Sequence, residues 1–96
     1  MKEETVKRKV REILEYAGCW YCMPAQNGFG RNGIPDFVGC YEGRFFAIEC
    51  KGTGGSLRPL QRVEMALIFE AGGTTFLATP DTTDNEVRVW LRRLGS

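Results

Sequence analysis

The chain has 96 residues, which is enough for one small domain spanning residues 1–96. It contains 13 basic residues, 12 acidic residues and no histidine, which excludes Ser-His-Asp triads, Cys-His nucleophiles and histidine-based zinc sites. No apolar run is long enough to span a membrane, and the charged first ten residues do not resemble a signal peptide, so we expect a cytoplasmic protein.

The apolar periodicity and the turn residues predict seven secondary-structure elements. Gly18 is a typical helix C-cap, Pro24 ends a strand, and the Glu42-Gly43 pair is typical of a two-residue hairpin turn. In chain order we expect a helix over 2–17, a strand over 19–24, a loop over 25–34, hairpin strands over 36–41 and 44–51, a helix over 56–71 capped by Ser56, a strand over 74–78, and a helix capped by Thr82, Thr83 or Asp84 that ends near Leu94.

This order is α-β-β-β-α-β-α and predicts an α/β fold. The strand-helix-strand segment over 44–78 has the length of a right-handed crossover, which joins parallel strands. The hairpin strands pair antiparallel. We therefore expect a mixed central sheet flanked by helices.

The hairpin turn predicts which residues face each other. If Glu42-Gly43 is the turn, paired residue numbers sum to 85, and Asp36 then lies opposite Glu49 on one face. Lys51 projects to the same face, because it is two residues beyond Glu49. Two carboxylates and an amine should therefore cluster at the end of the hairpin.

A pair of carboxylates with an adjacent amine favours metal-assisted chemistry on phosphate esters. Asp36 and Glu49 offer the oxygen ligands that Mg²⁺ or Mn²⁺ prefers, and the backbone carbonyl of Cys50 could complete the set. Lys51 could orient water and stabilise negative charge on the phosphate. The alternative is a plain cross-strand charge cluster on a solvated sheet face.

The cysteines offer a second, weaker metal hypothesis. Cys19 and Cys22 form a CxxC pair, but in a strand these two side chains point to opposite faces and do not make a zinc knuckle. We therefore expect Cys19, Cys22, Cys40 and Cys50 to be buried, reduced thiols. The aromatic side chains are likewise expected to lie mostly in the core; among them are Trp20, Tyr21, Phe29, Phe45, Phe46 and Phe69.

Two short motifs resemble the PD-(D/E)xK nuclease superfamily, and within it a stand-alone VRR-Nuc domain. They are the segment G-R-N-G-I-P-D over 30–36 and the segment I-E-C-K over 48–51, followed by Leu57-x-x-x-Gln61 on a helix. The resemblance covers nearly the whole chain. It implies a restriction-endonuclease-like core and Mg²⁺- or Mn²⁺-dependent cleavage of DNA.

The resemblance also implies roles for individual residues. Asp36 and Glu49 match the metal ligands, and Lys51 and Gln61 match catalytic positions. A glutamate on the first helix is expected to hold the metal through water. Glu3 and Glu4 compete for this role, and we favour Glu3 because it shares a helix face with the apolar residues.

The resemblance to stand-alone members of this family further implies that the substrate is branched DNA such as a four-way junction, cut by a homodimer. The apolar segments 19–24 and 65–69 are candidate dimer surfaces, and the candidate DNA contacts are Arg31, Asn32, Arg58 and Arg62, with Gly28, Gly30 and Gly33 shaping the loop. The alternative function is a catalytically silent nucleic-acid-binding module with the same fold.

Overall fold

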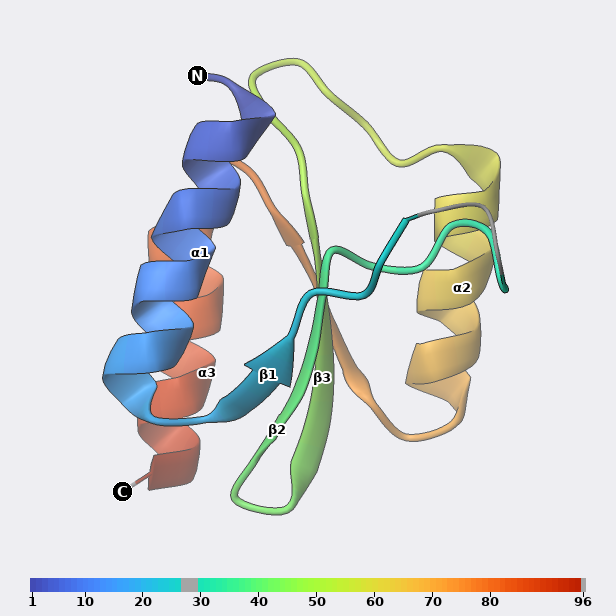
Figure 1. The fold of residues 1–96 in the computed structure, drawn as a ribbon. Helices are drawn as coiled ribbons and strands as arrows, with labels where there is room; N and C mark the ends of the chain where they lie inside the picture. The colour runs from blue at the N-terminus through green and yellow to red at the C-terminus, as the bar shows by residue number, and fades with distance from the viewer. Residues whose placement is uncertain (27–29, 96) are drawn as a thin grey trace.

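The computed structural model describes residues 1–26 and 30–95, apart from the side chains of 83–85. Within those residues, three helices and four strands follow the predicted order α-β-β-β-α-β-α (Figure 1). They are α1 (Glu3–Ala17), β1 (Trp20–Cys22), β2 (Phe37–Tyr41), β3 (Arg44–Cys50), α2 (Pro59–Glu70), β4 (Thr74–Ala78) and α3 (Thr83–Gly95).

The strands form one mixed sheet in the order β1-β2-β3-β4. β1 and β3 both pair antiparallel with β2, whereas β4 pairs parallel with β3 after the α2 crossover. The predicted mixed sheet and the predicted parallel pairing are therefore confirmed.

The hairpin register is also confirmed. Tyr41 pairs with Arg44 and Phe37 with Ile48, so paired residue numbers sum to 85 along β2 and β3. The turn is possible because Glu42 and Gly43 both take left-handed conformations, at φ 50° and 76°. A turn of this kind matches the right-handed twist of the two strands.

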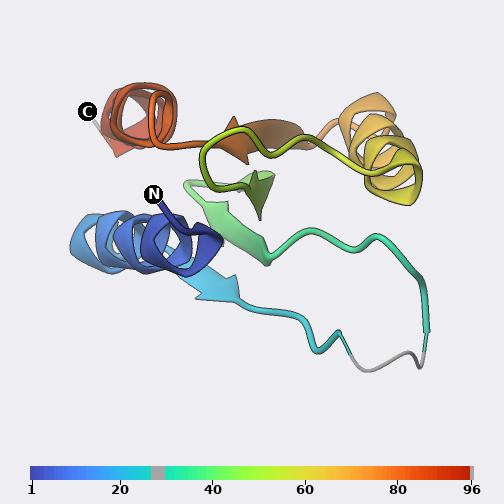
Figure 2. The same ribbon diagram turned by 90° about the horizontal axis from the view of Figure 1, so that it is seen from above.

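Helices lie on both sides of the sheet. α1 and α3 lie side by side on one side, and α2 lies alone on the other (Figures 1 and 2). Alternate residues of the central strands face the α1 and α3 layer and form the core there with residues of both helices. This core contains Val6, Val10, Ile13, Leu14, Phe37, Phe46, Ile48, Cys50, Phe76, Ala78, Val87 and Leu91.

Several predicted boundaries are wrong by a few residues. β1 covers only three residues of the predicted 19–24 strand. α2 begins at Pro59 with Arg58 at its N-cap, so Ser56 does not cap it. The residue before a proline avoids the helical conformation, and Arg58 accordingly stays extended, with ψ at 159°.

Candidate functional site

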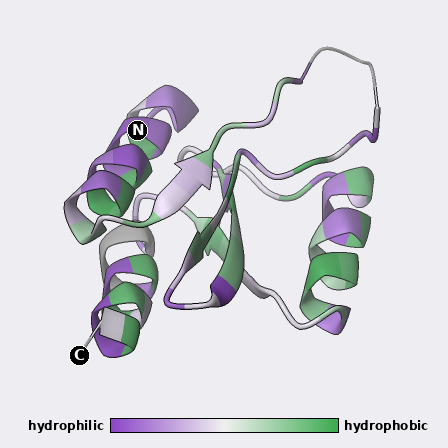
Figure 3. Ribbon diagram, turned by 60° about the horizontal axis from the view of Figure 1, so that its bottom comes forward, coloured by the Kyte–Doolittle hydropathy of each residue, from purple (hydrophilic) through white to green (hydrophobic). Residues whose placement is uncertain are grey.

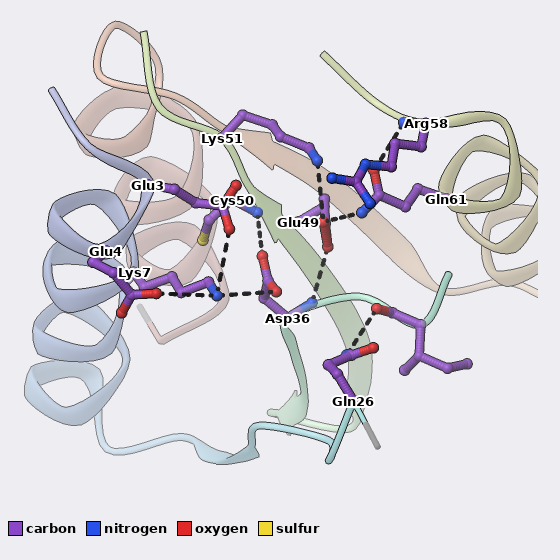
Figure 4. Close-up of polar contacts among 11 residues, drawn as sticks. Glu3, Glu4, Lys7, Gln26, Asp36, Glu49, Cys50, Lys51, Arg58 and Gln61 are labelled. Atoms are coloured by element: carbon purple, nitrogen blue, oxygen red, sulfur yellow. Dashed lines mark hydrogen bonds and ion pairs between the residues drawn. The ribbon is translucent and has the colours of Figure 1, made fainter. Parts of the chain in front are cut away.

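Asp36 and Glu49 meet where β2 and β3 part. Each carboxylate accepts a backbone hydrogen bond from across the hairpin: Asp36 N–H, one residue before β2, donates to Glu49 Oε1 at 3.1 Å, and Cys50 N–H in β3 donates to Asp36 Oδ2 at 2.9 Å (Figure 4). These two side chains thus continue the hydrogen bonding between the two segments beyond the last paired residues of β2 and β3. The predicted juxtaposition of the two acids is therefore present.

Glu49 is buried together with this second negative charge. Only 3% of the residue is exposed. Burial first, and then repulsion from Asp36, raise the pKa of Glu49 from 4.5 to about 7, although Lys51 and the Asp36 N–H work in the opposite direction. Burial and the second acid therefore favour the protonated form of Glu49 up to about neutral pH.

Lys51 and Gln61 both reach Glu49 Oε2. The Lys51 ammonium lies 3.9 Å from this oxygen, and the Gln61 amide donates to it at 2.9 Å. Lys51 is itself only 8% exposed, so its charge acts in a poorly solvated place. Glu49, Lys51 and Gln61 are thus brought together as the sequence predicted.

The start of α2 fixes the direction of the Gln61 amide. Arg58 N–H donates to Gln61 Oε1 at 2.8 Å, which satisfies one of the unpaired donors of the first helical turn. With its oxygen held there, the amide must present its NH₂ group to Glu49. The capping interaction of α2 therefore aims a hydrogen-bond donor into the site.

Lys7 is the residue that sequence reasoning missed. Its ammonium lies 3.6 Å from Asp36 Oδ1, 3.4 Å from Glu3 and 3.6 Å from Glu4 (Figure 4). Burial lowers the pKa of Lys7, but the three carboxylates, led by Asp36, outweigh burial and raise it overall. The i, i+4 spacing of Glu3 and Lys7 predicts their own contact, but nothing local predicts the contact with Asp36.

The two N-terminal glutamates differ in exposure. The Glu3 side chain is 44% exposed and that of Glu4 is 83% exposed. Glu3 therefore lies closer to the body of the protein than Glu4, as its helix face predicted. Its proposed role as a ligand through water stays a prediction.

The candidate DNA-binding residues fall into different surroundings. Arg31 makes a two-pronged ion pair with the buried Glu64 of α2, and these hydrogen bonds hold the pKa of Glu64 below its usual range. Asn32 is exposed in the same loop, while Arg58 and Arg62 are exposed at the start of α2. The predicted loop glycine Gly28 lies outside the described residues.

Gly33 presses this loop against α2. A Cβ atom on Gly33 would lie 2.6 Å from the Leu60 carbonyl group, and the residue has a φ of 78°. Only glycine fits such an approach in that conformation. The loop that leads to Asp36 is thereby seated on the helix that carries Gln61.

The cysteine prediction is only partly correct. Cys50 lies in the core, as expected, and burial followed by the nearby carboxylates raises the pKa of its thiol, so the thiol stays protonated. Cys19 is half-buried, but Cys22 and Cys40 are exposed. These two lie on the side of β1 and β2 opposite to the core, which α1 and α3 do not cover.

Among the described residues, no three acidic, cysteine or histidine side chains converge as a ready metal site. Asp36 and Glu49 supply two carboxylates, and one or two carboxylates with water are enough for Mg²⁺. The raised pKa of Glu49 is the sign of a site that a cation would stabilise. The donor set therefore fits a hard divalent ion.

Comparison with known proteins does not place the chain in a family. It matches no family model and no curated protein.

Within residues 1–26 and 30–95, none of the helices has the length and apolar character that a bilayer crossing requires.

Proposed function

We propose that this protein is a Mg²⁺- or Mn²⁺-dependent DNA endonuclease with a restriction-endonuclease-like core, related to stand-alone VRR-Nuc domains. The observation that carries the proposal is the convergence of Asp36, Glu49, Lys51 and Gln61 at the end of the β2–β3 hairpin. The sequence resemblance and the spatial cluster identify the same four residues.

Asp36, Glu49 and the Cys50 carbonyl would hold the ion, with Glu3 contributing through water. Such an ion polarises a phosphoryl oxygen and lowers the pKa of water. Asp36 and Glu49 are held in place by each other's strand, because each accepts a backbone hydrogen bond across the hairpin. The ligands are therefore positioned before any substrate arrives.

Lys51 and Gln61 would act on the scissile phosphate. A poorly solvated ammonium stabilises the negative charge that develops during phosphodiester hydrolysis and orients the attacking water. The Gln61 NH₂ group, held by the Arg58 N–H, can donate to a phosphate oxygen without adding charge. Asn32 and Arg58 are exposed nearby for contacts with the DNA backbone.

We further propose that the substrate is branched DNA and that the active form is a homodimer. A chain of 96 residues offers little surface for DNA. A two-fold dimer would present two sites to a two-fold substrate such as a four-way junction. A monomer has a single site and could not place one site at each of the two equivalent positions of such a substrate.

The alternative is a DNA-binding module without cleavage. One observation favours it: every carboxylate oxygen of Asp36 and Glu49 already has a protein partner. In that case the acids would serve as a structural ion-pair network, and the protein would bind DNA without consuming it.

The test compares cleavage of labelled linear, flap and four-way junction DNA by the wild type and by Lys51→Met. We expect cleavage only with Mg²⁺ or Mn²⁺. Lys51→Met should bind Mn²⁺ at least as tightly as the wild type, because a positive charge next to Glu49 is lost, but it should cleave about 100-fold more slowly, because it lacks the charge that stabilises the transition state.

The control is Lys9→Met, which removes a lysine from the far side of α1, where Lys9 lines a hollow next to α3. It should cleave at the wild-type rate. Binding of DNA without cleavage under any divalent ion would support the silent module instead. Equal rates for Lys51→Met and the wild type would remove the proposed role of Lys51.

A further inference from the structure

The helix α2 exposes most of its apolar side chains, whereas a glutamate and a glutamine lie on its buried side. The residues that it buries are Glu64 and Met65, and Gln61 beside them is half-buried. Its apolar side chains are largely exposed: Leu60 is 55%, Val63 53%, Leu67 45% and Phe69 68% exposed. A helix that is apolar on most sides is normally covered on most sides. Figure 3 shows that hydrophobic colour covers much of α2, whereas α1 is mostly hydrophilic.

The inner face of α2 carries two polar side chains, Gln61 and Glu64, beside the apolar Met65 and Ile68, and both polar groups have partners at the site. Gln61 donates to Glu49, and Glu64 holds Arg31. The apolar outer face has no such explanation within the described residues. Exposed apolar groups gathered on one element of a small protein mark an interaction surface.

Two opposite charges on the outer face lie at equal distances on either side of Ala66. Arg62, Ala66 and Glu70 are spaced i, i+4 and i+8, so they form one stripe with the small Ala66 at its centre. Val63 and Phe69 lie three residues on either side of Ala66 and flank this stripe. In the described part of the chain, neither Arg62 nor Glu70 forms an ion pair with another side chain.

We propose that α2 pairs antiparallel with α2 of a second copy of this chain, with the two-fold axis passing next to Ala66. In that arrangement Arg62 of each copy lies opposite Glu70 of the other, which gives two equivalent ion pairs. Ala66 allows the helix axes to approach closely, and the pairing covers Val63 and Phe69 in both copies.

This pairing assigns Arg62 to the dimer rather than to DNA. It also separates the two copies of Gln61 by about 15 Å along the helix axes, since each lies five residues before the centre. The inference stands on the surface of α2 alone and does not depend on the proposed nuclease activity.

Sedimentation velocity over a concentration series tests the proposal. A single pair of short helices buries a modest area, so we expect a dissociation constant of about micromolar order for the wild type. Arg62→Glu and Glu70→Arg each place like charges together twice and should weaken the dimer about ten-fold or more. The double variant Arg62→Glu/Glu70→Arg should return to within about three-fold of the wild type.

Arg8→Glu is the matched control, because Arg8 is exposed on α1 and carries the same charge change. It should leave association unchanged, and circular dichroism verifies that every variant folds. Ala66→Glu should abolish the dimer. A wild type that stays monomeric at millimolar concentration, single reversals that behave like Arg8→Glu, or a double variant that fails to recover would each overturn the proposal.

Discussion

At the residue scale, the candidate site is a balance between two acids, the buried Glu49 and the half-buried Asp36, and two lysines. Asp36 contacts Lys7 from α1, and Glu49 contacts Lys51, which directly follows β3. Lys51 lies beside Glu49 by strand alternation, as the sequence predicted. Lys7 approaches from α1, which lies on the side of the sheet opposite to α2 (Figure 2). The two carboxylates are therefore contacted by ammonium groups from both sides of the sheet.

The position of Lys7 leads to a prediction about metal affinity. Replacing Lys7 by Met removes a positive charge 3.6 Å from Asp36 Oδ1. Because this site is partly solvated, the lost repulsion should be worth about 1 kcal/mol, and the dissociation constant for Mn²⁺ should fall about five-fold. Isothermal titration calorimetry measures the change.

Lys9→Met is again the control, since it removes the same charge from the same helix at a distance from Asp36. Its Mn²⁺ affinity should match the wild type. Equal gains in the two variants would mean that only net charge matters and that Lys7 has no local role.

At the element scale, the loop before β2 and the helix α2 form one supporting unit. Arg31 holds Glu64, and Gly33 contacts the backbone at Leu60. The loop that carries Asp36 and the helix that carries Gln61 are thus fastened together at two points. This support explains why a loop residue and a helix residue can hold a common geometry around Glu49.

Gly33→Ala should therefore be much more harmful than Gly30→Ala. Both glycines have positive φ, at 78° and 96°, but a Cβ atom on Gly30 would meet nothing within 4 Å. Gly30→Ala should cost about 1 kcal/mol from backbone conformation alone. Gly33→Ala adds a clash with backbone atoms and should cost about 3 kcal/mol in the free energy of unfolding.

Urea denaturation of the two variants provides the comparison. Similar losses would show that the loop is not seated on α2. A larger loss for Gly33→Ala, together with weaker Mn²⁺ binding, would show that this seating supports the site.

At the scale of the whole molecule, Glu49 couples stability to pH. Its pKa is 4.5 in an unfolded chain and about 7 in the folded protein, so between these values the folded state holds a proton that the unfolded state has lost. Stability therefore falls as the pH rises through this window, by about 3 kcal/mol in total for the metal-free protein.

Chemical denaturation in EDTA at about pH 5.5 and about pH 8 measures this effect. Glu49→Gln removes the titrating group and should flatten the dependence over that range. The proposed Mg²⁺ ion would bind the ionised pair, so Mg²⁺ should stabilise the wild type mainly at the higher pH. A wild type and a Glu49→Gln variant with the same pH dependence would contradict the prediction.

Local chemistry in the sequence was sufficient to predict the element order, the mixed sheet and the hairpin register. The turn residues Glu42 and Gly43 determine the register, and the register alone places Asp36 opposite Glu49. Strand alternation then adds Lys51. The register and the strand alternation depend on neighbours along the chain or across one tight turn, and the parallel pairing follows from the length of the strand-helix-strand segment, which is why a pattern reveals them.

Only the tertiary structure decided which distant groups join them. Lys7, Arg31 and Glu64 acquire their partners because α1, the loop and α2 pack around the sheet end, and no periodicity encodes such contacts. The same limit explains the wrong prediction that Trp20, Phe45 and Phe69 are buried: they are 66%, 45% and 68% exposed. A hydrophobic side chain is more stable when it is buried, but the packing of the helices against the sheet determines whether this chain alone buries it.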